Sequence, residues 1–113
     1  MKISSTFTSP QVDSFVAIGI GNVYERADKN IFKRYSIQVA GDAVAATAWS
    51  VDLEGSLNGV NFDTILTHTT GTGDGKVMYS GAEVYPAKYI RSNLASLTLG
   101  SATKLKVYIL GSQ

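Results

Sequence analysis

The sequence contains no cysteine, which excludes disulfide bridges, thiolate metal sites and thiol nucleophiles. It is also poor in charge, because only 17% of its 113 residues are charged, and ten Lys and Arg against nine Asp and Glu leave a net charge of +1. A protein that binds nucleic acid through its surface charge needs a basic excess, so we expect no nucleic-acid partner.

Long apolar runs are missing as well. No segment approaches the roughly 20 apolar residues that a membrane-spanning helix needs. The first seven residues, MKISSTF, lack the continuous apolar stretch of a signal peptide. We therefore expect no membrane partner and a protein made in the cytoplasm.

The sequence does contain short runs of β-branched and aromatic residues, separated by turn residues such as its 11 glycines. This pattern predicts strands, and no segment has the pattern of an amphipathic helix. The charged stretch Asn22–Asn30 is expected to be a loop, with or without a helical turn, and Val84–Ala87 is expected to be extended because of Pro86. The expected strands are Val12–Ile20, Tyr35–Val39, Trp49–Leu57, Val60–Thr67, Lys76–Tyr79, Tyr89–Leu94 and Lys104–Leu110.

The predicted fold is all-β: an antiparallel β-sandwich of jelly-roll or Greek-key type with seven to eight strands. Residues 11–113 form this single domain. Residues 1–10 are polar and are expected to form an N-terminal arm or a short edge strand. Within Val12–Ile20, the alternation of Val16, Ile18 and Ile20 with small residues predicts one buried face.

The alternation is clearest between Trp49 and Leu57. Its apolar face is Trp49, Val51, Leu53 and Leu57, and its polar face is Ser50, Asp52, Glu54 and Ser56. Trp49 is therefore expected in the core rather than on a sugar-stacking surface. Asn58-Gly59 follows directly, and this pair predicts a two-residue type I′ turn that leads into a return strand.

Three possible active-site or metal-site motifs fail on their spacing. The run from Gly71 to Lys76 has three residues between its outer glycines, whereas a phosphate-binding loop needs four. No Gly-x-Ser-x-Gly elbow accompanies His68, so a solvent-facing histidine at a strand end is expected instead of a catalytic triad. The carboxylates Asp52, Glu54, Asp63 and Asp74 lack the spacing of a calcium loop and are expected to form a solvated face. We expect no catalytic residue, no cofactor and no metal.

The segment VDLEGSLNGVNF, residues 51–62, resembles the apolar-x-Leu-x-Gly-Ser-x-Asp-Gly-x-x-Trp hairpin of small tailed-bacteriophage virion proteins. Asn58 stands where Asp is usual and Phe62 where Trp is usual, and both keep the turn and the apolar anchor. Residues 87–94 resemble the next strand of those proteins, and residues 106–111 resemble their closing strand. The resemblance extends over about two thirds of the chain, from Tyr35 to Leu110.

This resemblance implies a non-enzymatic structural protein of the virion. The expected role is that of a capsid decoration, or cementing, protein on the head surface, with a neck or tail accessory protein as an alternative. Its partners would be the major capsid protein or other virion proteins, and analogy suggests a homo-oligomer, with a trimer as the first guess. Near-neutral charge fits such dense packing, because self-repulsion between copies stays small.

The N-terminal arm and the Asn22–Asn30 segment are expected to supply contacts to the capsid or to sister subunits. Tyrosine and arginine are enriched at protein interfaces, and the arm carries two large apolar side chains. The expected interface residues are Ile3, Phe7, Tyr24, Arg26, Tyr79 and Tyr85.

A second interpretation stays open. The run Tyr89-Ile90-Arg91 also resembles a strand of discoidin-type sugar-binding domains. A carbohydrate-binding or host-adhesion module is therefore an alternative, and an isolated accessory domain or small enzyme is a third.

Overall fold

The structure is a computed structural model that describes residues 2–5, 11–26, 31–32, 34–42, 44–70, 75–79 and 87–112. Across these residues the chain forms ten strands and no helix, so the expected all-β class is confirmed. This part of the chain accordingly holds no helix of the length and apolarity that crossing a membrane would require.

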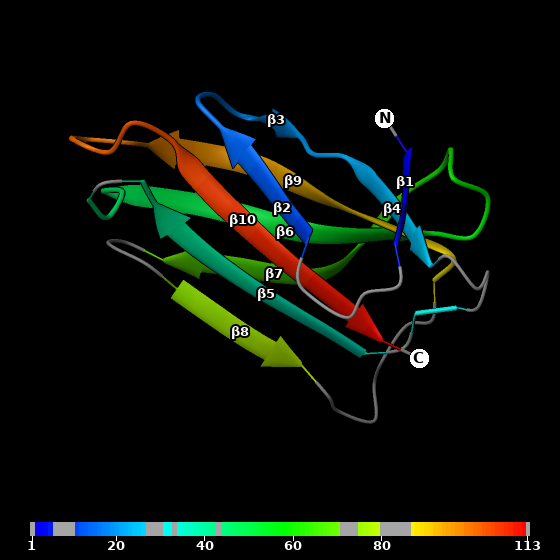
Figure 1. Ribbon diagram of the computed structural model, residues 1–113. Helices are drawn as coiled ribbons and strands as arrows, with labels where there is room; N and C mark the ends of the chain where they lie inside the picture. The colour runs from blue at the N-terminus through cyan, green and yellow to red at the C-terminus, as the bar shows by residue number, and fades with distance from the viewer. Residues whose placement is uncertain are drawn as a thin grey trace.

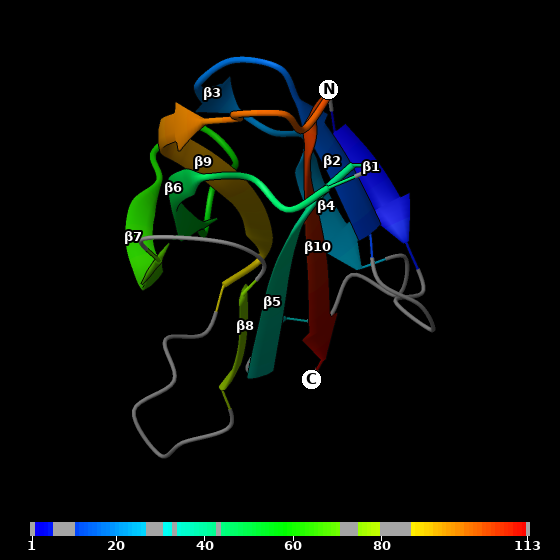
Figure 2. The ribbon, with the colours of Figure 1, turned by 90° about the vertical axis from the view of Figure 1, so that its left-hand side faces the viewer.

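The strands form two sheets that face each other (Figures 1 and 2). The first sheet has the order β1 (Lys2–Ser5), β4 (Val23–Arg26), β9 (Tyr89–Thr98), β6 (Ala48–Ser56), β7 (Asp63–Thr70), and the short β3 (Gly19–Ile20) also pairs with β9. The second sheet has the order β2 (Gln11–Phe15), β10 (Leu105–Ser112), β5 (Arg34–Gly41), β8 (Gly75–Tyr79). All pairs are antiparallel except β1 and β4, which run parallel.

The core forms where the apolar faces of the two sheets meet. In the second sheet the alternation predicted for β5 and β10 is confirmed, because Ile37 pairs with Ile109 and Val39 with Val107, and all four are buried. Burying one such side chain contributes roughly 1.5–3 kcal/mol. The largest fully buried side chains are Trp49, Tyr24, Tyr35, Phe32, Ile37, Leu53, Ile90, Leu94, Leu105, Ile109, Val39 and Val51.

The segment predicted as one strand, Val12–Ile20, is divided between the two sheets. β2 ends at Phe15, the chain bends at residues 16–18, and β3 then pairs with β9 in the other sheet. Asp13 and Phe15 are buried, whereas Val16, Ile18 and Ile20 are exposed. The prediction that these three form a buried face is therefore wrong, because β2 turns its other face to the core.

The predicted loop Asn22–Asn30 contains strand β4, so this prediction is wrong for Val23–Arg26. Tyr24 pairs with Ile90 of β9, and both side chains are buried. Of the two alternatives for residues 1–10, the edge strand is seen at Lys2–Ser5, which pairs with β4. β1, β3 and β4 are the three strands that the described residues add to the seven expected from the sequence.

A buried carboxylate, that of Asp13 in β2, links the two sheets. Its Oδ1 accepts hydrogen bonds from the Tyr24 hydroxyl at 2.7 Å and from Asn22, through Nδ2 at 2.9 Å and the backbone amide at 3.3 Å. Its Oδ2 accepts a hydrogen bond from the Ser92 hydroxyl of β9 at 3.1 Å. A side chain at Gly21 would collide with Asp13 and Ser92, so glycine makes this close approach possible. Burial is the larger cause that raises the pKa of the Tyr24 hydroxyl well above its usual range, and the hydrogen bond to Asp13 raises it further.

This arrangement predicts that Asp13→Asn lowers the free energy of unfolding by about 1.5–3 kcal/mol, the usual value of a hydrogen bond to a charged group. The substitution keeps the size of the side chain but places an NH₂ group where an oxygen accepted a hydrogen bond. Urea denaturation measures the loss. Asp52→Asn, at a partly exposed position of β6, is the matched control and should stay within about 0.5 kcal/mol of the wild type. Equal effects of the two substitutions would contradict the structural role of Asp13.

Candidate functional site

The loop between β6 and β7 is longer than the sequence suggests. Residues 57–62 separate the strands, so the predicted two-residue type I′ turn is wrong. The glycine requirement is nevertheless real, because Gly59 has a φ of +78°, in the left-handed region. Leu57, predicted to face the core, is 74% exposed because it follows the last residue of β6, where the core ends.

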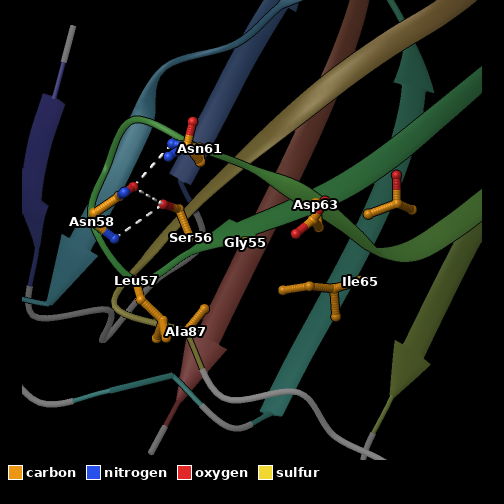
Figure 3. A pocket seen from close by; sticks show the side chains of 9 residues that line it. Gly55, Ser56, Leu57, Asn58, Asn61, Asp63, Ile65 and Ala87 are labelled. Carbon is orange, nitrogen blue, oxygen red and sulfur yellow. Dashed lines mark hydrogen bonds between the residues drawn. The ribbon is translucent and has the colours of Figure 1, made fainter.

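Ser56 and Asn58 hold this loop together through their side chains (Figure 3). Asn58 Oδ1 accepts hydrogen bonds from the backbone amides of Val60 and Asn61, both at 2.9 Å, and from the Ser56 hydroxyl at 3.0 Å. Ser56 Oγ accepts hydrogen bonds from the backbone amides of Asn58 at 3.2 Å and Gly59 at 2.9 Å. In the Ser-x-Asn-Gly run, hydrogen bonds from backbone amides to side-chain oxygens therefore take the place of strand pairing. The Asp that is usual at position 58 in the resembled motif could accept the same hydrogen bonds from backbone amides.

The outer face of β6 is not a solvated polar face at this end. The pairing register of β6 shifts between Leu53 and Glu54, and both Glu54 and Ser56 are buried. Glu54 Oε1 accepts a hydrogen bond from Arg91 Nε at 2.6 Å, and its Oε2 accepts one from Asn93 Nδ2 at 3.1 Å. The Arg91 guanidinium lies 4.0 Å from the centre of the Phe62 ring. Phe62, which occupies the place of the Trp in the resembled motif, thus anchors the loop to β9.

Both carboxylate oxygens of Glu54 therefore accept hydrogen bonds from β9. Across the described residues, no group of three or more His, Asp or Glu side chains is placed to hold a metal ion. The side chains of His68 and of the Gly71–Asp74 part of the glycine-rich loop lie outside the described residues.

A pocket of about 560 Å³ opens beside this loop, at the end of the sandwich (Figure 3). Its apolar wall combines Leu57 with Ile65 and Ala87, and Gly55 leaves room because a side chain there would meet Ile65 and Ala87. The polar lining is Ser56, Asn58, Asn61, Asp63 and Thr64. The volume falls within the range of roughly 300–1,000 Å³ that is typical of small-molecule sites.

A second surface lies at the opposite end of the sandwich, at the turn between β2 and β3 (Figure 1). Val16, Ile18 and Ile20 are 74%, 63% and 56% exposed. We call residues 16–20, which comprise the bend at residues 16–18 and the short strand β3, the apolar turn. Single exposed apolar side chains are common on proteins, but several that are contiguous usually mark an interaction surface.

The described residues among those predicted for an interface lie in three different strands, β1, β4 and β8. Tyr24 is 1% exposed and bonded to Asp13, so the structure places it in the core instead of on a surface. Arg26 is partly exposed at the end of β4. Ile3 belongs to β1 and Tyr79 is the last residue of β8, with side chains outside the described part of the chain, and Phe7 and Tyr85 lie outside it altogether.

In comparisons with known proteins, no family model, no curated protein and no solved structure matches this chain. The two surfaces are therefore interpreted from their own geometry. Neither was predicted from the sequence. The signal for the apolar turn was the run of apolar residues 16–20, and the signal for the pocket was the absence of a side chain at Gly55 beside a polar loop.

The loop geometry predicts that Gly59→Val lowers the free energy of unfolding by about 1–3 kcal/mol, because a β-branched residue resists a positive φ. A Cβ at this position would also contact the Tyr89 ring at 3.4 Å. Gly59→Asn is the matched control and should cost less, since asparagine tolerates the left-handed region. Thermal or urea denaturation of both variants provides the measurement. If Val and Asn were equally well tolerated, the backbone assignment at Gly59 would be wrong.

Proposed function

We propose that this chain is a non-enzymatic structural protein of a bacteriophage virion, most simply a capsid decoration protein that binds the head surface. The apolar turn is the observation that carries the proposal. It presents three large apolar side chains within five residues, at one end of a small sandwich. Apolar area removed from water contributes roughly 25 cal/mol per Å², so such a turn gains free energy when a partner covers it.

The hairpin that carries the resemblance to virion proteins supports the same proposal. Ser56, Asn58 and Phe62 each make a defined contact in the loop, so the motif residues have structural reasons to occur together. The proposal includes a jelly-roll or Greek-key arrangement of the sandwich, a homo-oligomer, with a trimer as the first assembly to test, and a location on the virion after synthesis in the host cytoplasm. It is also compatible with a neck or tail accessory protein.

The proposed contacts change with the structure. The apolar turn takes the place of Tyr24 among the proposed contacts, and Ile3, Phe7, Arg26, Tyr79 and Tyr85 stay as candidate contact residues.

Copy number separates the possible positions on the particle. Quantitative mass spectrometry of purified virions from the phage that encodes the chain should find it in a fixed ratio to the major capsid protein. A few copies per particle would indicate a neck or tail accessory protein. Absence from purified virions would contradict the proposal.

The apolar turn can be tested directly with a Val16→Ser/Ile18→Ser double variant. We expect the variant to fold with unchanged thermal stability, because both side chains are exposed, but to lose at least tenfold in binding to heads or in self-association. Co-sedimentation with heads and sedimentation velocity measure the two effects. Val60→Ser is the matched control, since Val60 is 78% exposed in the hairpin loop, far from the turn. Unchanged assembly of the double variant would show that the turn is not the contact surface.

A further inference from the structure

One wall of the pocket, the β6–β7 loop, is held by its own side chains. Asn58 Oδ1 accepts three hydrogen bonds, and Ser56 Oγ accepts two, all from within residues 56–61. The Phe62 ring beneath Arg91 anchors the end of the loop. A ligand that contacts this loop therefore loses little free energy to loop ordering when it binds.

The pocket also presents polar groups that face solvent. Asn58, Asn61, Asp63 and Thr64 are all exposed. The side chains of Asn61, Asp63 and Thr64 make no hydrogen bond to another described residue. An amide offers donors and an acceptor, a carboxylate accepts, and a hydroxyl does both, so these groups together suit a ligand with several hydroxyls.

The charge of the lining restricts the ligand further. Among the described residues that line the pocket, Asp63 is the ionisable one, and none of them is Lys or Arg. An anion would therefore meet a carboxylate without a compensating cation. A hard cation such as calcium needs six to eight oxygen ligands, commonly with several carboxylates, and one carboxylate falls short of this requirement.

We propose that this pocket binds a neutral, hydroxyl-rich ligand, that is, a saccharide. Its hydroxyls would bond to Asn61 and Asp63, and its C–H surface would pack against Leu57 and Ile65. The site lies at the opposite end of the sandwich from the apolar turn (Figure 1), so a chain docked through the turn would keep the pocket open. The proposal does not depend on the virion role.

The test is an NMR titration of the ¹⁵N-labelled full chain with glucose, galactose, N-acetylglucosamine and maltose, with inorganic phosphate as the anionic comparison. At least one saccharide should shift the backbone amide signals of residues 55–65 in a saturable manner, and phosphate should not. Asn61→Ala and Asp63→Asn should each weaken that binding at least tenfold. Both positions are exposed, so the same spectra should show an intact fold.

Asp52→Asn is the matched control, because Asp52 lies on the same strand pair but does not line the pocket. It should leave saccharide binding unchanged. The proposal is overturned if no saccharide shifts these amides, if the shifts map to another surface, or if phosphate shifts them as strongly. Equal weakening by Asp52→Asn would also overturn the assignment to the pocket.

Discussion

The carboxylate of Asp13 constrains much of the fold. Buried between two sheets, it needs hydrogen-bond donors, because an unpaired charge in an apolar interior is strongly unfavourable. Donors come from Tyr24 in β4, from Asn22 before it, and from Ser92 in β9. To supply them, the chain must leave the second sheet after β2 and enter the first through β3 and β4. The close approach at Gly21 and the bend at residues 16–18 both belong to this crossing.

The bend has a direct consequence for the surface. Since β2 turns Asp13 and Phe15 to the core, the following apolar residues cannot continue that face, and Val16 and Ile18 point into solvent. The same crossing that satisfies the carboxylate therefore creates the apolar turn. A surface of this kind suits contact with another protein, and this links the core of the domain to its proposed role.

At the other end, the β6–β7 loop shows how side chains can replace strand pairing. Ser56 and Asn58 accept hydrogen bonds from backbone amides that have left the ladder, while the ion pair of Glu54 and Arg91 and the ring of Phe62 hold the loop on the outer face of β9. Because the hairpin opens out here, Gly55 and Ala87 border a pocket rather than a filled core. The hydrogen-bonded loop and the exposed polar side chains of Asn61, Asp63 and Thr64 border the same pocket.

Local pattern alone determined the strands in which apolar and polar residues alternate strictly. β5, and β6 from Trp49 to Leu53, were predictable because apolar residues at every second position place one face of a strand in the core. The glycine at position 59 was predictable for a similarly local reason, the positive φ that a turn demands.

Tertiary structure decided which face of β2 is buried and that the charged stretch after Asn22 contains a strand. It also decided that Glu54 is buried and forms an ion pair with Arg91. Each depends on partners far along the chain, such as Ser92 for Asp13, 79 residues away, or Arg91 for Glu54, 37 residues away. A polar residue can be buried only where distant segments bring donors to it, and local sequence does not record which segments those are. The apolar turn and the pocket share this origin, since both lie where the chain departs from regular strands to make such contacts.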